Sequence, residues 1–440
     1  MPIVRRSSVT GFVALLAAAA AVVCCLASSA SAYGGSRTGY LRAANKGAKQ
    51  LHRWWVRGLQ WYTPVLGGTR NASLWQTVPI FEAYAGLDLA QPSRRHELLL
   101  DWFAENAERF LNSSLEPVPG FGNRPDQEGA NKTAWFDDNG WWGLAYLDAY
   151  RATGNPEWLT DAEIAQKFIS VSGWDTTPGR PGGIWWNTNR SFYAGESLAG
   201  GTLLSARLYA LTHDRHYLDD AIKFINWGDA WLTDPSTGLY ARLRKPGTYP
   251  DTTSAPTAAT TPIGTAQAAA ADRRALADNP DEAAKLEAAG GGSPPAGRAG
   301  AASGNYPPFA PSPMPYVNGP MILAHRIICD QTGKRSYCDR ARELANTTLR
   351  VYRRFWMGPQ FDFWYVRTML EFAQDDHSEN WYGIARRSAR SALHKAHDRQ
   401  GLYLRTWYGK KAAAASAPKG SLQLHAANAA LFAWMGALGR

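Results

Sequence analysis

The sequence predicts an all-α protein in which six helical hairpins close into a ring, an (α/α)6 barrel. A helix pair is readable over residues 139–170, and its pattern returns 59 residues later and again 120 residues beyond that. Setting aside an amino-terminal segment and one insertion leaves roughly 345 residues, which is about six pairs at this spacing. Repeats of this period share one continuous core, so we expect a single domain over residues 33–440, interrupted by the insertion.

The first helix pair follows from the spacing of its apolar residues. The first helix carries an apolar face made of Trp141, Trp142, Ala145, Tyr146, Ala149 and Tyr150. Gly154 and Pro156 then supply a stop signal. The second helix is marked by Trp158, Ala162, Ala165, Phe168 and Ile169. Each set recurs every third or fourth residue, which is the period of an amphipathic helix.

The two later copies are identified by matching positions. In the second copy, Tyr209, Thr212, Leu218, Asp220 and Ala221 match Tyr150, Thr153, Leu159, Asp161 and Ala162. In the third copy, Thr332, Tyr337 and Ala341 match Thr212, Tyr217 and Ala221. The turn of this third hairpin, CDQTGKRSYC, is bracketed by Cys329 and Cys338.

An insertion explains the longer interval before the third copy. Residues 249–313 are rich in Ala, Pro, Gly, Ser and Thr, a composition that cannot bury a core. We expect this segment to be disordered, and we assign it no function.

The first 32 residues have the pattern of a secretory signal peptide. Arg5 and Arg6 precede an apolar run from Gly11 to Ala27, and small residues at 30–32 resemble a cleavage site. No later segment offers about 18 uninterrupted apolar residues, so we expect a secreted protein without a membrane anchor. Removal of the signal would leave Cys329 and Cys338 as the remaining cysteines. An oxidising compartment favours a disulfide between them, although spacing alone leaves two unpaired thiols open.

The charge of the chain argues against nucleic acid as a partner. The formal net charge of +10 falls to +8 without Arg5 and Arg6, and it is spread along the chain. No basic stripe of the kind that nucleic acid requires is present in the sequence. We expect a monomer.

Short Gly-aromatic segments separate the predicted hairpins. They are PGGIWWN (181–187), GLYARL (238–243), QFDFWYVR (360–367) and GLYLRTWY (401–408). As loops at one mouth of a helical ring, they would line a cleft, and Trp and Tyr rings can stack on the C–H face of a sugar. For any single Trp, ordinary core packing remains the alternative.

Two adjacent acids, Asp137 and Asp138, stand in the aromatic stretch AWFDDNGWWGLAY. A helix N-cap near Asn139 would explain one carboxylate but not two. A metal site would need further oxygen ligands, and Asn139 is the only candidate nearby, so no metal or cofactor is expected. Glycoside hydrolysis does require two carboxyl groups, and a separation of about 5–5.5 Å between them implies a covalent intermediate with retention of configuration. Neighbours in a loop can diverge to that separation.

The chain resembles glycoside hydrolase family 76, the endo-α-1,6-mannanases. The likeness rests on WFDDNGWWGLAYLDAY, on GGIWW about 45 residues later and on ARLY in the next hairpin. The resemblance implies an (α/α)6 barrel, a retaining mechanism and an α-1,6-linked mannan substrate. It further implies that Asp137 is the nucleophile and Asp138 the general acid/base.

The resemblance and the aromatic segments together give a set of candidate substrate-binding residues. They are Trp135, Trp141, Trp142, Trp185, Trp186, Asn187, Glu196, Tyr316, Asn318 and Arg367. Tyr316 and Asn318 belong to PYVNGP, which resembles a cleft loop of the family. Glu196 belongs to SFYAGESLAGG, where the family commonly has an Asn-containing stretch; either Glu196 takes over a polar role there or the subsite recognises another sugar.

Other functions compete with a mannan hydrolase. GESLAGG echoes the nucleophile elbow of serine hydrolases around Ser197, but Ala199 stands where Gly is expected and no buried strand is predicted before it. A non-catalytic sugar-binding protein would keep the tryptophans without needing both acids. A mannan transglycosylase would use the same two carboxylates, and a lyase, an epimerase or an inverting glycosidase could occupy the same ring.

Overall fold

The computed structural model describes residues 36–244, 313–352, 355, 358–408 and 420–439. The predicted signal peptide lies outside these residues, as does all of the predicted insertion except Pro313, so both remain predictions. Twelve α-helices account for most of the described residues: α2 (Arg37–Gln50), α3 (Leu74–Ala90), α4 (Arg94–Ala107), α5 (Phe136–Thr153), α6 (Pro156–Lys167), α7 (Gly195–Thr212), α8 (Arg215–Trp231), α11 (Pro315–Thr332), α12 (Arg335–Val351), α13 (Pro359–Asp376), α14 (Glu379–Lys395) and α15 (Leu422–Leu438).

The described residues also form three antiparallel pairs of two-residue strands. They are β1 (Trp55–Val56) with β2 (Trp61–Tyr62), β3 (Leu111–Asn112) with β4 (Gly120–Phe121), and β5 (Tyr193–Ala194) with β6 (Leu243–Arg244). All three pairs lie in connections between helices. They fix loops against one another and form no sheet layer.

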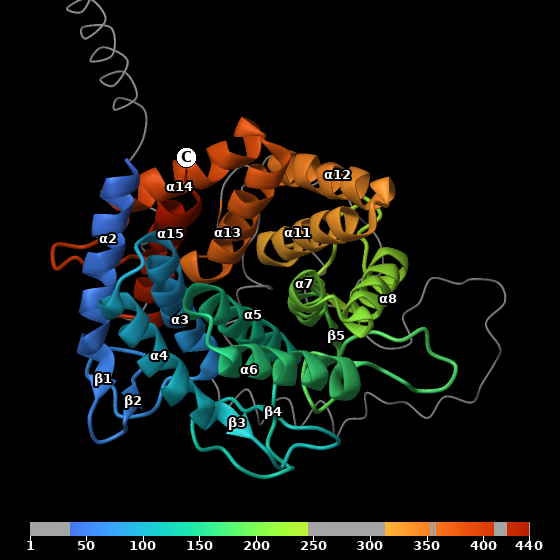
Figure 1. The fold of residues 1–440 in the computed structure, drawn as a ribbon, viewed down its shortest axis with the longest axis horizontal. Coiled ribbons are helices and arrows are strands. Elements are labelled where there is room, and N and C mark those ends of the chain that lie inside the picture. Colours follow the sequence, from blue (N-terminus) through green and yellow to red (C-terminus); the bar gives the residue numbers. More distant parts are fainter. Residues whose placement is uncertain (1–35, 245–312, 353–354, 356–357, 409–419, 440) are drawn as a thin grey trace, which may run out of the picture.

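The helices form two concentric rings (Figure 1). The inner helices contact one another in the order α3, α5, α7, α11, α13 and α15, and α15 returns to α3. Each inner helix also packs on one outer helix: α4, α6, α8, α12, α14 and, for α15, the first described helix, α2. The predicted (α/α)6 barrel is therefore confirmed, and the contact between the first and last described helices helps to close it.

The division into inner and outer helices follows from the residues. In α5 every residue from Phe136 to Ala149 is buried, and in α15 every residue from Leu424 to Gly436. By contrast, α12 buries only Ala341, Leu344, Ala345, Thr347 and Thr348 on one face. A helix that is buried on all sides belongs to the inner ring, whereas an amphipathic helix can form an outer wall.

The inner helices all begin at the same end of the barrel. Tyr316, the second residue of α11, places its ring 5.2 Å from that of Phe361, the third residue of α13. On the other side of the ring, the Nε2 of Gln423, the second residue of α15, donates to the backbone oxygen of Trp75, the second residue of α3, at 2.9 Å. Residues early in different inner helices therefore share one layer.

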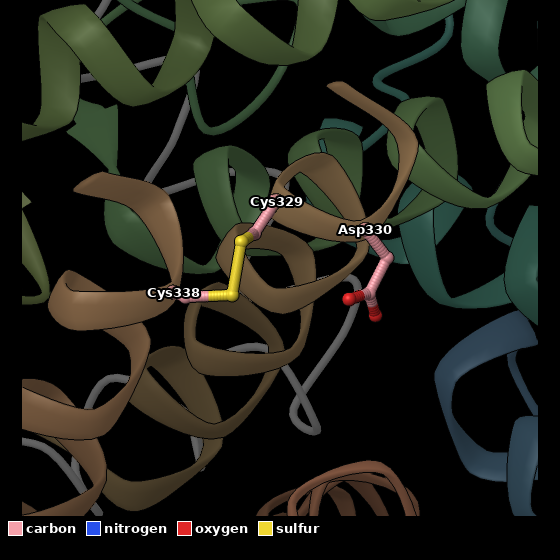
Figure 2. Close-up of side chains that lie close together, drawn as sticks. All are labelled: Cys329, Asp330 and Cys338. Atoms are coloured by element: carbon pink, nitrogen blue, oxygen red, sulfur yellow. A yellow bond between two sulfur atoms is a disulfide. The ribbon is translucent and has the colours of Figure 1, made fainter. Parts of the chain in front are cut away.

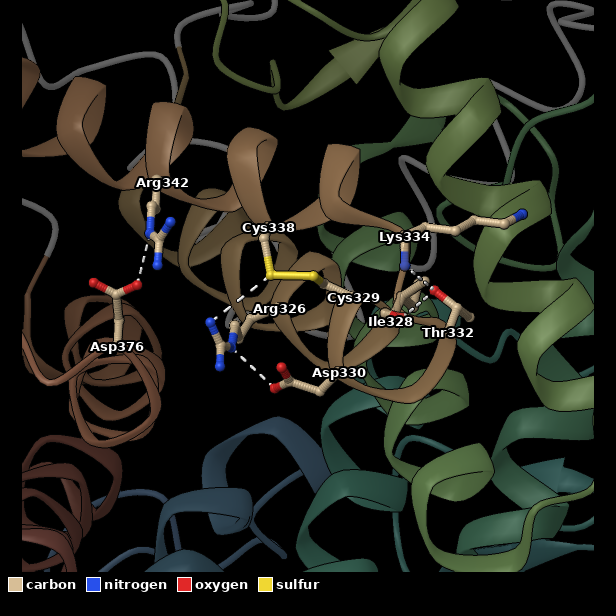
Figure 3. The surroundings of a disulfide bond; sticks show 9 residues. All are labelled: Arg326, Ile328, Cys329, Asp330, Thr332, Lys334, Cys338, Arg342 and Asp376. Carbon is tan, nitrogen blue, oxygen red and sulfur yellow. Dashed lines mark hydrogen bonds and ion pairs between the residues drawn. A yellow bond between two sulfur atoms is a disulfide. The ribbon is translucent and has the colours of Figure 1, made fainter.

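The predicted disulfide is present between Cys329 in α11 and Cys338 in α12, with a Cα–Cα distance of 5.3 Å (Figure 3). It ties the two helices of one hairpin across their turn. Asp330 lies close to both sulfurs (Figure 2), but both cysteines are spent in the disulfide, and Asp330 accepts a hydrogen bond from Arg326 Nε at 2.9 Å. These three residues therefore do not form a metal site.

Two segments that the sequence analysis read as loops are helical. QFDFWYVR (360–367) forms the first two turns of α13, and PYVNGP (315–320) opens α11. Pro315 and Pro359 occupy the first positions of these helices, where a missing backbone N–H has no cost and the fixed φ favours the helix. Among the described residues, no helix combines the length and the apolar character needed to cross a membrane.

Candidate active site

Asp137 and Asp138 lie in the first turn of α5, not in a loop before it. The helix begins at Phe136, three residues earlier than expected, and its N-cap is Trp135. Successive residues of an α-helix project about 100° apart. The two carboxylates therefore diverge because of helical rotation, and not because they are neighbours in a loop, as the sequence had led us to expect. Both side chains are buried, at 0% and 2% exposure.

Asn139 serves the fold. Its Oδ1 accepts a hydrogen bond from Phe121 N at 2.8 Å, and its Nδ2 donates to Phe121 O at 2.9 Å and to Trp135 O at 2.8 Å. The side chain thereby fastens β4 to the start of α5. These hydrogen bonds account for the buried Asn139 side chain without a role as a metal ligand.

One face of α5 turns toward the barrel axis. Trp141, one turn after Asp137, stacks on Trp364 of α13 with ring centroids 4.6 Å apart. Helices α5 and α13 stand opposite one another in the ring, so the two indoles meet across the axis. Asp148, further along the same face of α5, forms an ion pair with Arg367 of α13. Asp137 thus belongs to the axial stripe of its helix.

Glu196 occupies in α7 the position that Asp137 occupies in α5, the second residue. Its Oε1 accepts hydrogen bonds from Arg242 Nε at 2.7 Å and from the Tyr316 hydroxyl at 3.0 Å. Burial raises the pKa of Glu196, Arg242 opposes this shift, and the charge of Asp137 adds to it. Asp137 therefore lies within electrostatic reach of Glu196. Three adjacent inner helices contribute one polar residue each to this layer.

Four of the six inner helices begin without a side-chain cap. The N-cap residues of α5, α7, α11 and α13 are Trp135, Ala194, Met314 and Gly358, none of which has a side-chain oxygen. The N-caps of α3 and α15, Ser73 and Ser421, do accept hydrogen bonds from their helices. The first turns of α5, α7 and α13 instead carry Asp137, Asp138, Glu196 and Asp362. The positive end of each helix dipole stabilises a carboxylate there.

The GGIWWN segment lies beside the acid pair. Phe136 N donates to Trp186 O at 2.9 Å, and Trp135 pairs with Asn187 in an isolated bridge. Trp135, Trp186 and Ala194 form a small apolar cluster separate from the main core. These contacts bring Trp135, Trp186 and Asn187 to the start of α5.

Two of the predicted tryptophans pack elsewhere. Trp142 lies in the core between α3, α4 and α5, with its ring centroid 5.4 Å from that of Phe81 and 5.3 Å from that of Phe110. Trp185 packs its ring 4.4 Å from that of Tyr193 within the main core. Trp142 follows Trp141 in a helix, where successive side chains point in different directions. Trp185 precedes Trp186 in an extended segment, where successive side chains point to opposite sides.

Asn318 and Arg367 also have structural partners. The Oδ1 of Asn318 accepts from Tyr240 N at 2.9 Å and its Nδ2 donates to Tyr240 O at 3.0 Å, the same device that Asn139 uses. Arg367, only 1% exposed, pairs with Glu82 at 2.8 Å and with Asp148, and its guanidinium stacks 4.1 Å from the Trp434 ring. Its charge is thus used inside the barrel, beyond the Trp141–Trp364 contact.

Arg242 was missed as a site residue by the sequence analysis. It lies in the segment GLYARL, which was expected only to line a cleft with its aromatic residue. The pattern Gly-Leu-Tyr-x-Arg recurs at 401–405, and this repetition is a signal that would have drawn attention to the Arg. The rival Ser197 lies in the first turn of α7 and, contrary to expectation, the two-residue strand β5 does precede it.

A separate cavity of about 1230 Å³ opens on the outer wall. Its lining comes from α2, α3, α4, the short turn after α2 and the β1–β2 pair, with Trp55, Tyr62 and Trp102 among the aromatic residues. None of the residues predicted for the site contributes to it. The cavity is therefore distinct from the layer that contains Asp137.

Comparisons with known proteins agree with the resemblance drawn from the motifs. Residues 122–271 match the sequence model of glycosyl hydrolase family 76. No curated protein matches the sequence. A family 76 α-mannanase from Bacteroides thetaiotaomicron shares the fold with a TM-score of 0.68 and 17% identity, over 90% of this chain and 95% of that chain.

Two further solved structures share the fold. An α-1,6-mannanase of Salegentibacter sp., described as an inactive variant with two consecutive Asp replaced by Asn and bound to α-1,6-mannotriose, has a TM-score of 0.63 and 14% identity, over 91% of this chain and 99% of that chain. Dfg5 from Chaetomium thermophilum, in complex with glucosamine, has a TM-score of 0.62 and 15% identity, over 91% of each chain. The likeness extends over nearly the whole barrel.

Proposed function

We propose that this chain, which matches glycosyl hydrolase family 76 in sequence and in fold, is a secreted retaining glycoside hydrolase that cleaves α-1,6-mannosidic linkages in mannan. The observation that carries the proposal is the placement of Asp137 and Asp138, two buried carboxylates in the first turn of an inner helix. The Salegentibacter mannanase supports the proposal. Its variant with two consecutive Asp replaced by Asn is described as inactive, and its ligand is α-1,6-mannotriose.

The reaction assigns one role to each carboxylate. The Asp137 carboxylate attacks the anomeric carbon, and the bond from that carbon to the leaving sugar oxygen breaks while Asp138 donates its proton to that oxygen. Water then attacks the anomeric carbon and gives a proton to Asp138, and the ester bond to Asp137 breaks. Two displacements at one carbon leave the configuration unchanged.

The position of Asp137 suits the nucleophile. It lies on the axial stripe of α5, one turn from the stacked Trp141 and Trp364. The amino-terminal end of α5 stabilises its negative charge. Trp135, Trp186 and Asn187 at the start of α5 are the proposed further contacts of the substrate.

Export of the protein is part of the same proposal. The amino-terminal pattern of residues 1–32 indicates a signal peptide, and the Cys329–Cys338 disulfide is typical of an oxidising compartment. A mannan polymer is also a substrate that a secreted enzyme would encounter. Detection of the mature chain in the medium, beginning near Tyr33, would test this part by amino-terminal sequencing.

Product analysis tests the reaction. The protein is incubated with α-1,6-mannan, with other yeast mannans and with bacterial mannosides, and released oligosaccharides are identified. NMR of the first product from a synthetic α-mannoside should show the α-anomer, and release of the β-anomer would refute the two-displacement mechanism. Products longer than the substrate would identify transfer to a sugar acceptor in place of hydrolysis.

A further inference from the structure

The ion pair between Glu196 and Arg242 is incompletely satisfied. Both side chains are fully buried, and Glu196 Oε1 receives the hydrogen bonds from Arg242 Nε and from Tyr316. Glu196 Oε2 has no hydrogen-bond partner within the described residues, and neither do the two terminal nitrogens of Arg242. One buried cluster therefore holds an unused acceptor beside unused donors.

Such an arrangement is costly in a protein interior. Each buried polar group without a partner loses its hydration and gains nothing in return, and charged groups lose the most. Most buried polar groups in folded proteins find a partner for this reason. The unpaired donors of Arg242 and the unpaired acceptor of Glu196 are explained if a bound ligand forms hydrogen bonds with them.

The cluster adjoins the proposed nucleophile. A Cβ built on Gly200 in α7 would lie 3.2 Å from the Cα of Gly140 in α5 and 3.8 Å from the backbone oxygen of Asp137. The backbones of the two helices touch there, and Asp137 and Glu196 stand one turn earlier on the two helices. The charge of Asp137 also acts on the pKa of Glu196.

The local charge selects a neutral ligand. Among the described residues of this layer, the carboxylates of Asp137 and Glu196 outnumber the cation of Arg242, since Asp138 holds a proton as the proposed acid. A carboxylate or phosphate would pair with the guanidinium but would meet these two like charges, and like charges a few ångströms apart repel strongly in a buried site. A hydroxyl group avoids this repulsion, since its oxygen accepts from Arg242 and its proton can be donated to Glu196 Oε2.

We propose that Arg242 and Glu196 together bind two adjacent hydroxyl groups of the neutral sugar ring that reacts at Asp137. The terminal nitrogens of Arg242 donate hydrogen bonds to the two oxygens, and Glu196 Oε2 accepts a hydrogen bond from one of the two hydroxyl groups. This inference rests on the proposed glycoside hydrolase function and adds to it the residues that recognise the ring. Tyr316 positions Glu196 by donating to its other oxygen.

The test removes the donors from the protein and, separately, one hydroxyl from the sugar. Arg242→Lys keeps the positive charge but loses the forked pair of N–H donors. Arg109→Lys is the matched control, because Arg109 forms an ion pair with Asp126 away from the proposed site. Each protein is assayed on α-1,6-mannotriose and on analogues that lack one hydroxyl of the ring at the cleaved bond. We expect Arg242→Lys to lower kcat/KM on mannotriose by roughly 10- to 100-fold and Arg109→Lys to leave it unchanged.

The coupling between protein and sugar decides the outcome. On the analogue that lacks a contacted hydroxyl, wild-type kcat/KM falls, and Arg242→Lys adds less than about 3-fold further loss, because the interaction is already gone. An equal loss on every analogue would show that Arg242 acts without touching a hydroxyl, and it would overturn the proposal. Full activity of Arg242→Lys on mannotriose would overturn it too.

Binding without turnover supplies a second readout. Calorimetry with α-1,6-mannotriose uses protein carrying Asp137→Asn and Asp138→Asn, with and without Glu196→Gln or Arg242→Lys. We expect Glu196→Gln or Arg242→Lys to weaken binding about 10-fold or more. Unchanged binding would refute the proposed contacts of Glu196 and Arg242 with the sugar. If the wild type cleaves mannotriose but Glu196→Gln and Arg242→Lys have no effect, only the proposed role of Glu196 and Arg242 is rejected. If the wild type neither cleaves nor binds mannotriose, the proposed function is rejected together with that role.

Discussion

Gly140 of α5 and Gly200 of α7 bring the backbones of two inner helices into direct contact. A Cβ added at Gly140 would lie 2.9 Å from the Cα of Gly200, closer than such atoms approach in proteins. This contact sets the spacing between the first turns of α5 and α7. Since Asp137 and Glu196 are carried by those turns, a packing feature positions two acids that are 59 residues apart in the sequence.

Gly140→Ala should therefore impair activity without removing any functional group. The added methyl group meets backbone, which cannot move aside as a side chain could, and overpacking of this kind costs roughly 1–3 kcal/mol. We expect lower stability and a reduced kcat on α-1,6-mannan, measured by denaturant unfolding and by product release.

Gly39→Ala is the matched control for this change. Gly39 also lies in a helix, α2, and the nearest atom to an added Cβ is at 3.4 Å, an ordinary contact. Alanine is the better helix former, so this substitution should leave activity intact and not lower stability. Equal behaviour of the two variants would show that the α5–α7 contact does not position the acids.

Asp137→Asn and Asp138→Asn should each abolish turnover. Asparagine keeps the shape of the side chain, but it can neither form the glycosyl ester nor donate a carboxylic acid proton. We expect a loss in kcat on the order of 10³ or more at either position, with little change in stability. Circular dichroism would establish that each variant is folded before activity is measured.

Asp219→Asn provides the comparison for the acid pair. Asp219 also belongs to two adjacent acids, but it lies on the exposed side of α8 in an ion pair with Arg215. Its replacement should leave activity unchanged. Near-normal rates for a variant of Asp137 or Asp138 would end the assignment of that residue.

The sequence predicted the barrel because its information is periodic and local. The hairpin of α5 and α6 repeats with matching residues in α7 and α8 and in α11 and α12. The acid pair was found for the same reason, since both residues stand in one short motif. Even so, the boundary of α5 was misplaced, because Trp135 gives no capping signal in the sequence.

Contacts between distant segments were beyond the reach of the sequence. Arg242 and Glu196 meet only when the connection after α8 folds back on α7, and no local pattern states that pairing. Likewise, Arg367 appeared as a candidate for substrate binding from its motif. Its partners Glu82 and Asp148 come from two other inner helices, and only the closed ring brings the three together.

Loss of the Cys329–Cys338 disulfide should lower stability and leave the reaction intact. The bond closes a short loop between α11 and α12, and constraining a loop of this length contributes about 2–3 kcal/mol. We expect Cys329→Ser with Cys338→Ser to lower the unfolding free energy by that amount in urea. Activity at a temperature well below unfolding should be unchanged, because the bond lies at the far ends of these helices from Tyr316. A large loss of kcat in the folded double variant would contradict this separation.

Asp161, a buried carboxyl in α6, should make stability depend on pH. Burial raises its pKa to about 7, and the charges of Glu108 and Glu157 add to the shift. In the unfolded chain an Asp has a pKa of about 3.9, so between about pH 4 and pH 7 the folded state binds this proton more tightly. Stability from this group is therefore present below pH 4 and is lost as pH rises toward 7.

Asp161→Asn removes this dependence because the amide stays neutral. We expect the variant to exceed the wild type in unfolding free energy by about 1–3 kcal/mol at pH 8 and to match it near pH 3.5, where Asp161 is protonated in both states. Denaturant unfolding across this pH range measures the difference, and Asp219→Asn, at an exposed site, should show no comparable rise. If the advantage of Asp161→Asn were the same at both pH values, the cause would lie in packing and not in the proton held by the folded state.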